Sequence, residues 1–368
     1  MSAQPAVPRE VPRRIHRAAR TEDAVRGVIN RRLSARGWRP AVLPFSGYGR
    51  AAAPGEPDAG WVRVLARVLL TPPGPGRRRS PAAVRGWRRF VAAPAPGVPV
   101  AVEVAGRRHE VVSGRDGYLD VVLPADLPPG PTEALVTVGG APPVPAPLYV
   151  VPNGPGTGIV SDIDDTVMVT ALPRPVVAFW NTFVRQEASR RPVPGMPLLY
   201  HALLDAHPGA FVVYLSTGPW NVAPALEQFL ARNGYPPGPL LLTDWGPTDS
   251  AWFRSGQEHK LTQLGRLLRE LPEVSWLLVG DDGQHDPEIY GRIARDAPDR
   301  VEAVVLRQLT VIEQVLTHGT AEPPEQGREA PAQVPEVRAP DGVQLLAALR
   351  RRGLLPQAPG WPTSSSGF

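Results

Sequence analysis

The sequence predicts an α/β domain in which helices cover both faces of a parallel sheet, preceded by a smaller β-rich domain. Two observations lead to this fold class. From Trp61 to Val151 apolar and polar residues alternate with a period of two, which is typical of half-buried strands. After residue 152, short apolar runs alternate with stretches of helical periodicity, which indicates parallel strands joined by helices.

Residues 1–50 are predicted to form a basic arm that contains one helix. Residues 1–40 hold ten arginines against three acidic residues, and apolar residues recur at helical spacing from Glu22 to Arg36. Residues 44–49, Pro-Phe-Ser-Gly-Tyr-Gly, are typical of a turn. Such an arm can meet an anionic membrane or nucleic acid; the alternative interpretation is a solvated arm in an arginine-rich protein.

Residues 51–151 are predicted to form a small β-sandwich-like domain, because short strands alternate with Gly and Pro turns. The strands are expected near 62–70, 97–105, 108–113, 118–123, 133–138 and 147–151. No cluster of catalytic residue types lies on their faces, so we interpret this domain as a module for interaction or stabilisation.

Residues 152–316 are predicted to form the α/β domain. Its strands are expected at 158–161, 210–215, 240–243, 276–279 and 301–306, with helices near 176–188, 196–206, 221–233, 258–270 and 287–296. Residues 317–368 are predicted to be a Pro-rich, largely disordered tail. This tail contains one short helix, which is capped by Asp341 and ends at Gly353.

Composition excludes several classes of protein. The chain has 47 Pro and 36 Gly in 368 residues but is 42% hydrophobic, which excludes a wholly disordered chain. The absence of Cys excludes disulfides and thiolate metal sites. No apolar run reaches the ~18 residues that span a bilayer. The N-terminal residues lack the apolar core of a secretory signal, so we expect a cytoplasmic location.

Polar residues follow the first two predicted strands of the α/β domain, where ligands bind in open parallel sheets. Asp162 and Asp164 follow the first strand and can hold a divalent metal, or divide the roles of nucleophile and acid. The alternative is an acidic turn that caps a helix. Ser216, Thr217 and Gly218 follow the second strand and offer a hydroxyl and free N–H groups to an anion. The alternative there is an ordinary helix cap.

A second acidic loop and a single lysine complete the set. Asp281, Asp282 and Asp286 follow the fourth strand among glycines; the alternative is a solvated acidic turn. Of 40 basic residues only Lys260 is a lysine, which indicates a position that needs a compact ammonium; the alternative is a surface ion pair. Together these groups supply what Mg²⁺-dependent phosphoryl transfer requires: metal-binding carboxylates, groups for phosphate oxygens and a nucleophile.

The longer motifs are similar to those of a known family. The strings SDIDDTVMVT (161–170), PVPGM (192–196), YLSTGPWN (214–221) and GDDGQHDPEIY (280–290) resemble the catalytic domain of the actin-patch-type phosphatidate phosphatases and their bacterial relatives. These belong to the haloacid dehalogenase (HAD) superfamily. The resemblance covers about residues 151–316 and implies a HAD-like Rossmannoid sheet. Asp282 departs from the family pattern, which usually has Ser there.

The resemblance implies roles for each matching residue. Asp162 would be the nucleophile that forms an aspartyl-phosphate, and Asp164 the general acid and base. Mg²⁺ would be held by Asp162, the Asp164 carbonyl and Asp281, with Asp282 or Asp286 reaching it directly or through water. Ser216, Thr217 and Gly218 would bind phosphate oxygens, and Lys260 would neutralise charge. Thr166 would support the loop.

The segments between the motifs leave no room for a large lid, so we expect an open site, which suits a phosphate on a large substrate or at a membrane surface. Phe179, Trp180, Trp220, Trp245 and Trp252 would border it, or else pack in the core. The residues and the resemblance together predict a Mg²⁺-dependent phosphomonoesterase, and the resemblance implies phosphatidate or a related phospholipid as its substrate. Two alternatives remain: the same chemistry on a soluble or protein-bound phosphate, and a non-catalytic adaptor for membrane or nucleic acid. The intact set of Asp162, Asp164, Lys260 and Asp281 argues against the adaptor, since a binding module needs no such arrangement, and nucleic acid is the less favoured partner.

Overall fold

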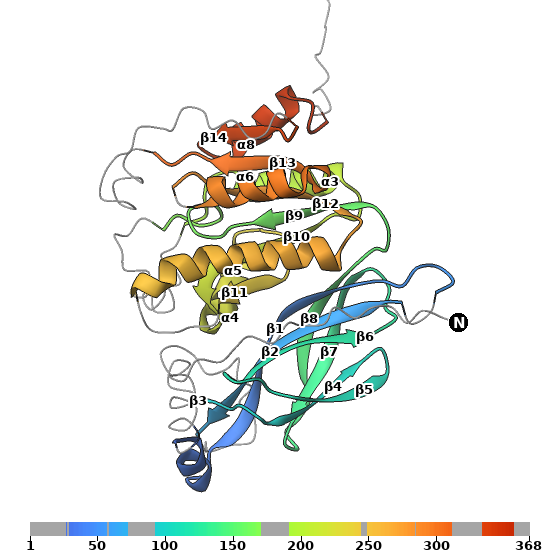
Figure 1. Cartoon of the computed structure of the whole chain (residues 1–368), viewed down its shortest axis with the longest axis vertical. Coiled ribbons are helices and arrows are strands. Elements are labelled where there is room, and N and C mark those ends of the chain that lie inside the picture. Colours follow the sequence, from blue (N-terminus) through green and yellow to red (C-terminus); the bar gives the residue numbers. More distant parts are fainter. Residues whose placement is uncertain are drawn as a thin grey trace, which may run out of the picture.

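The computed structural model describes residues 27, 29–56, 59–72, 93–170, 191–243, 249–283, 285–310 and 333–356, with the backbone alone at 221 and 249–255. The strands in these residues form two sheets with helices packed around the second (Figure 1). The mixed α/β fold class that the sequence predicts is confirmed. Helical backbone at 29–35 agrees with the end of the predicted N-terminal helix, whose first part lies outside the described residues.

The first sheet consists of strands from the N-terminal part of the chain. They are β1 (Arg39–Arg50), β2 (Trp61–Thr71), β3 (Ala93–Pro94), β4 (Pro99–Val104), β5 (Arg107–Val112), β6 (Tyr118–Pro124), β7 (Gly130–Val138) and β8 (Val144–Val151). Among the described residues they make one continuous sheet in the order β3-β2-β1-β8-β7-β4-β5, with β6 also paired to β2. All neighbours are antiparallel except β1 and β8.

The prediction of a turn at residues 44–49 is wrong, because this segment lies within β1. The register of β1 against β2 shifts between Phe45 and Tyr48, which marks a bulge. A Cβ atom on Gly47 would lie 2.1 Å from the carbonyl oxygen of Arg63. The glycine therefore allows a close approach of two backbones inside a sheet, rather than a chain reversal.

The second sheet is parallel throughout and has the order β11-β10-β9-β12-β13-β14. Its strands are β9 (Gly156–Ser161), β10 (Phe211–Pro219), β11 (Leu240–Thr243), β12 (Val274–Asp281), β13 (Val301–Arg307) and β14 (Glu336–Ala339). The helices are α3 (Met196–Ala206), α4 (Ala223–Arg232), α5 (Asp249–Glu270), α6 (Asp286–Asp296) and α8 (Gly342–Arg351), with short 3₁₀ turns η4 (Trp220–Val222) and η5 (Pro298–Arg300). Helices α5 and α6 lie in front of the strands in Figure 1 and α3 lies behind them. The predicted helix near 176–188 lies outside the described residues.

The sequence predicts residues 333–337 as part of a disordered tail, and the structure corrects this. β14 extends the parallel sheet beside β13, and α8 packs against α3 and β14. Val337 and Leu345 are buried in the same core as the other strands. The Glu- and Pro-rich composition around β14 concealed a strand of four residues, which is too short to show a clear period. Asp341 caps α8 as predicted, accepting a hydrogen bond from the Gln344 amide.

The β-rich sheet packs directly against the parallel-sheet domain. Phe45 of β1 stacks on Trp220 with ring centroids 4.5 Å apart. Glu270, at the C-terminal end of α5, accepts hydrogen bonds from Tyr48 Oη (2.7 Å) and Arg63 Nη2 (2.5 Å). Because a buried charge is tolerated only when it is paired and hydrogen-bonded, this cluster restricts how the two sheets can meet.

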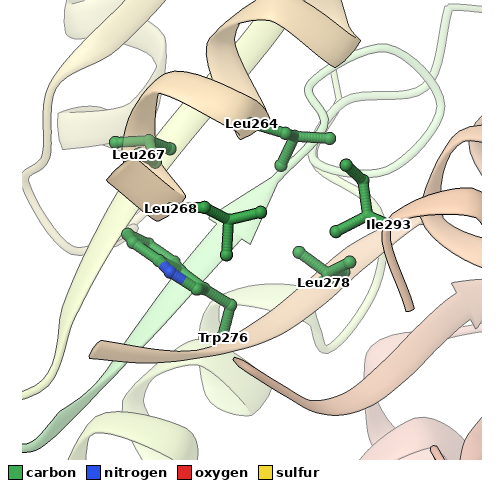
Figure 2. A pocket seen from close by; sticks show the side chains of 6 residues that line it. All are labelled: Leu264, Leu267, Leu268, Trp276, Leu278 and Ile293. Carbon is green, nitrogen blue, oxygen red and sulfur yellow. The ribbon is translucent and has the colours of Figure 1, made fainter. Parts of the chain in front are cut away.

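A small apolar gap lies between α5, α6 and β12. It is lined by Leu264, Leu267, Leu268, Trp276, Leu278 and Ile293 (Figure 2). None of these six lining residues is charged, so we interpret the gap as a feature of core packing and not as a reactive site. Among the described residues, no helix combines the length and apolar character needed to cross a bilayer.

Candidate active site

The polar residues that follow β9, β10 and β12 gather at one edge of the parallel sheet. β9 is hydrogen-bonded to β10 on one side and to β12 on the other, so their carboxyl ends are adjacent. The Asp162 amide donates to the Val279 carbonyl (2.9 Å), which continues the pairing of β9 with β12 past the end of β9. This topology places the loops after the three strands next to one another, as the sequence predicts.

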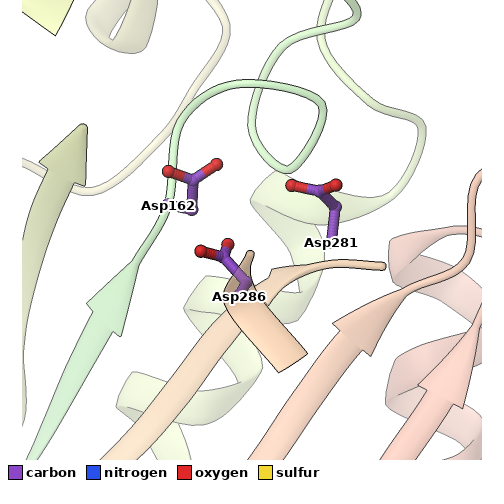
Figure 3. Close-up of side chains that lie close together, drawn as sticks. All are labelled: Asp162, Asp281 and Asp286. Atoms are coloured by element: carbon purple, nitrogen blue, oxygen red, sulfur yellow. The ribbon is translucent and has the colours of Figure 1, made fainter. Parts of the chain in front are cut away.

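Three carboxylates converge at this edge. Asp162 follows β9, Asp281 ends β12 and Asp286 begins α6, and their side chains point toward one another (Figure 3). One ligand atom from each lies within 4.8 Å of the others. All three residues are at most 3% exposed. Gly280 makes room for this arrangement, because a Cβ atom there would lie 2.4 Å from Asp286 Oδ2.

Lys260 lies between two of these carboxylates. Its Nζ donates hydrogen bonds of 2.6 Å to Asp162 Oδ1 and to Asp286 Oδ1. The residue is 6% exposed, so the alternative of a surface ion pair is wrong. Burial alone would lower the pKa of Lys260, but the carboxylates of Asp162 and Asp286 outweigh it and raise that pKa. The ammonium therefore stays charged.

The donor set fits a divalent cation. Three carboxylates face one ammonium, and Asp281 Oδ2 and Asp286 Oδ2 are buried with no hydrogen-bond partner among the residues that the structure describes. Burial raises the pKa values of the Asp162 and Asp281 carboxyls, and Lys260 opposes this effect. An oxygen-rich, negatively charged cluster is what Mg²⁺ prefers, and unpartnered buried oxygens are costly unless something binds them.

Asp164 and Ser216 lie beside the three-carboxylate cluster. Ser216 Oγ donates to Asp164 Oδ2 (3.2 Å), which links the loop after β9 to β10. Burial raises the pKa of Asp164 to about 7; the Asp165 charge adds to the increase, while Lys260 and the bond from Ser216 oppose it. The Asp164 carboxylate thus accepts a hydrogen bond from β10, while Lys260 and Asp286 lie close enough to affect its charge.

The irregular C-terminal part of β10, residues 216–219, is held by one hydrogen bond within it and one from β11. The Gly218 amide donates to Ser216 Oγ (2.9 Å), and Thr243 Oγ1 donates to the Thr217 carbonyl (2.9 Å). The Gly218 N–H that the sequence assigns to a phosphate oxygen is therefore directed to Ser216 in this structure. β10 is followed directly by Trp220, which is 8% exposed and packs on Phe45.

Asp282 has a different contact from the one that the sequence predicts. Its Oδ1 accepts a hydrogen bond from the Leu309 amide (2.8 Å), and it is outside the three-carboxylate cluster. Here the carboxylate joins the loop after β12 to the chain after β13. Of the five predicted aromatic residues, Trp220 packs in the core, and the side chains of Phe179, Trp180, Trp245 and Trp252 lie outside the described residues.

Further polar residues that sequence reasoning missed surround the site. Tyr200 shares a 2.6 Å hydrogen bond with Ser161, and Tyr290 Oη donates to the Val279 carbonyl (3.1 Å). Arg307 Nη1 donates to the Asp165 carbonyl (2.7 Å). The same strand-end reasoning applied to β13 would have found Arg307. The Thr166 hydroxyl is buried without a partner, in the loop it is predicted to support.

Comparison with known proteins agrees with the predicted resemblance. Residues 157–308 match the family model of the catalytic domain of phosphatidate phosphatase APP1. The chain is 27% identical over 233 residues to phosphatidate phosphatase APP1 of Saccharomyces cerevisiae, covering 59% of this chain and 39% of that protein. It is 24% identical over 155 residues to an uncharacterized protein of Schizosaccharomyces pombe, covering 42% and 25% respectively. The family resemblance is therefore confirmed for residues 157–308, and the chain spans less than half the length of these relatives.

Among solved structures, a carbohydrate acetylesterase from Xanthomonas citri is similar over 71% of this chain and 75% of its own, with 13% identity. The TM-score of 0.21 is too low to indicate a common fold.

Proposed function

We propose that this protein is a Mg²⁺-dependent, HAD-like phosphomonoesterase whose substrate is phosphatidate or a related phospholipid. The observation that carries the proposal is the buried cluster of Asp162, Asp281 and Asp286 with Lys260 at the carboxyl edge of the sheet. The similarity of residues 157–308 to a phosphatidate phosphatase catalytic domain supports the choice of substrate.

Asp162 is the nucleophile in this proposal. One carboxylate oxygen attacks phosphorus, the bond from phosphorus to the ester oxygen breaks, and an aspartyl-phosphate forms. Asp164 gives its proton to the departing alkoxide. In the second step Asp164 takes a proton from water as that water attacks phosphorus, which releases inorganic phosphate and restores Asp162.

The remaining groups offset negative charge. Lys260 holds Asp162 in place through its 2.6 Å hydrogen bond and lies beside the phosphoryl position. Ser216 and the turn after it bind phosphoryl oxygens. Asp162, Asp281 and Asp286, with the Asp164 carbonyl, would hold Mg²⁺, with Asp282 supporting its loop. When bound, Mg²⁺ supplies positive charge next to the transferred phosphoryl group.

The predicted division into domains remains part of the proposal, but the observed strands move two boundaries: the start of the β-rich unit and the end of the catalytic unit. The β-rich unit then begins at β1, and the catalytic unit includes β14 and α8. The basic arm is proposed to bring a cytoplasmic protein to an anionic membrane face. Sedimentation with phosphatidylglycerol vesicles at low and high salt tests this, since binding through arginines weakens as salt rises.

The activity is tested by phosphate release from phosphatidate in detergent mixed micelles, with Mg²⁺ or with EDTA. We expect release that requires Mg²⁺ and is lost in Asp162→Asn. Persistent turnover by Asp162→Asn would contradict the mechanism. Turnover of soluble phosphate esters with none on phosphatidate would contradict the lipid substrate alone and favour a soluble or protein-bound phosphate.

A further inference from the structure

Arg307 connects three loops at the carboxyl edge of the parallel sheet. It is the last residue of β13 and is 4% exposed. Its Nη1 donates to the Asp165 carbonyl (2.7 Å) and its Nε to the Pro340 carbonyl (3.2 Å). Its own carbonyl accepts from the Asp282 amide (2.9 Å). One side chain and its backbone thus hold the connections that follow β9, β12 and β14.

The contact with Asp165 falls at a strained point of the nucleophile loop. Asp165 has a φ of 55°, in the left-handed region that residues other than glycine seldom adopt. Its amide donates to the Met168 carbonyl (2.9 Å), and its Oδ1 accepts from the Thr170 amide (2.8 Å). The hydrogen bond from Arg307 adds a constraint on the carbonyl, so the surroundings determine the whole conformation of this residue.

The orientation of Asp165 determines the geometry of Asp164. The peptide unit after Asp165 is held by Arg307, and the φ and ψ angles of Asp165 together then set the direction of the preceding peptide unit. That preceding unit carries the carbonyl of Asp164 itself, and Asp162 lies two residues before it in the chain. A change in the contact with Arg307 would therefore alter both aspartates together.

We propose that Arg307 is a positioning residue, which holds the loop of Asp162 and Asp164 in the geometry that binds a divalent cation and phosphate. This inference rests on the proposed function of the same site. A guanidinium suits the role because its planar fork can donate to two carbonyls in different directions, whereas an ammonium is a compact point charge. The contact with Pro340 also makes the segment from β14 to α8 part of the support of the site.

The chain provides a matched control just before the same strand. Arg300 precedes β13 at the opposite edge of the sheet, and its Nη2 donates to the carbonyls of Leu271 (2.7 Å) and Val274 (2.6 Å). Arg300 and Arg307 thus both bind backbone carbonyls through a guanidinium. Only Arg307 contacts a loop of the site. If Mn²⁺ affinity and kcat fell through lost stability alone, they would fall in both variants.

The test measures Mn²⁺ binding to the full chain by the electron paramagnetic resonance signal of free Mn²⁺, and kcat and KM with p-nitrophenyl phosphate. The variants are Arg307→Gln, Arg307→Lys and Arg300→Gln, each with its melting temperature. We expect Arg307→Gln to weaken Mn²⁺ binding and lower kcat by about tenfold or more, since residues that orient metal ligands contribute on this scale. Arg307→Lys should lose less of the Mn²⁺ affinity and of kcat than Arg307→Gln does. Both quantities should stay within about twofold of the wild type in Arg300→Gln, because distant sites act independently.

Wild-type Mn²⁺ affinity and kcat in Arg307→Gln would overturn the inference, and so would an equal loss in Arg300→Gln. If Arg307→Gln does not fold, Arg307→Lys decides: wild-type affinity in that variant would also overturn it. A wild type that binds Mn²⁺ but hydrolyses no phosphate ester would contradict the proposed function and leave the role of Arg307 to be judged by the Mn²⁺ affinities. A wild type that binds no Mn²⁺ would overturn both.

Discussion

Lys260 Nζ lies 2.6 Å from Asp162 Oδ1, so the single lysine of the chain pairs with the proposed nucleophile. The same nitrogen lies 2.6 Å from Asp286 Oδ1. A guanidinium is planar and larger than an ammonium, and it does not fit between two carboxylates at these distances without displacing one of them. This pairing explains why a chain that otherwise uses arginine keeps a lysine here.

Lys260→Arg should therefore lower kcat by about 100-fold or more, a loss typical of removing one group that stabilises charge in the transition state. The measurement is kcat on p-nitrophenyl phosphate, with circular dichroism to show that the variant is folded. Arg266→Lys is the control, because Arg266 lies on the same helix but pairs with Asp120 away from the site. Equal losses of kcat in the two variants would contradict the role of Lys260 in stabilising charge in the transition state.

Asp281→Asn should stabilise the metal-free protein and abolish its stabilisation by Mg²⁺. Asp281 Oδ2 is buried without a partner, and the carboxylates of Asp286 and Asp162 lie close to it. Removing one negative charge relieves repulsion, but it also removes a ligand. For the wild type, Mg²⁺ at 100 times its Kd adds about 2.7 kcal/mol to the free energy of unfolding. Thermal melts with Mg²⁺ and with EDTA measure both effects; an unchanged response to Mg²⁺ in the variant would exclude Asp281 as a ligand.

Glu270→Gln should weaken the attachment of the β-rich sheet. Arg63 is 7% exposed and bonds Glu270 and Asp120, so removing one carboxylate leaves a buried cation poorly compensated. We expect the free energy of unfolding to fall by about 3 kcal/mol. Glu103→Gln is the matched control: it breaks an ion pair with Arg108, whose side chain is 57% exposed, and should cost less than about 1 kcal/mol. Urea unfolding of both variants makes the comparison, and equal costs would mean that the buried pair is not the stronger attachment.

Glu227 should make stability depend on pH. Burial raises its pKa from 4.5 to about 7, against the opposing hydrogen bonds from Ser46. Because the pKa is higher in the folded state, the neutral form is the one favoured by folding. The contribution of neutral Glu227 to the free energy of unfolding is fully present below about pH 4.5 and is lost as the pH rises to about 7. For a partly buried group this contribution is on the order of 2 kcal/mol.

The check is urea unfolding of Glu227→Gln and wild type at several pH values from 4.5 to 8. Glutamine stays neutral, so the variant should lose less stability over this range than the wild type does. Parallel curves for the two proteins would show that Glu227 keeps an ordinary pKa.

Much of the candidate site could be predicted because parallel strands bring their carboxyl ends to one edge. Asp162, Ser216 and Asp281 each follow or end an apolar strand, and finding the strands was enough to bring them together. Lys260 needed a different signal, its isolation among 39 arginines. The residue type of Arg307 does not mark it, since arginine is the ordinary cation of this chain, and only its position at the end of β13 does.

Other features depend on contacts that no local pattern records. Gly47 indicates a turn in sequence, but in the structure it admits the backbone of β2 beside β1. β14 is a strand because β13 offers it an unpaired edge, not because its four residues alternate. The contact of Asp282 differs from the predicted one for a similar reason. A carboxylate in an acidic loop can bind either a cation or a backbone amide, and here the position of the Leu309 amide favours the second.

Trapping of the phosphorylated enzyme tests the central claim most directly. Full-length Asp164→Asn is mixed with p-nitrophenyl phosphate and Mg²⁺, quenched and treated with borohydride, which reduces an acyl phosphate to the alcohol. This leaving group departs without a proton, so the aspartyl-phosphate should form and persist when Asp164 is absent. Peptide mass spectrometry should then find homoserine at position 162, and none in Asp162→Asn or without substrate. Homoserine at another aspartate, or phosphate release with no reduced aspartate, would contradict the account.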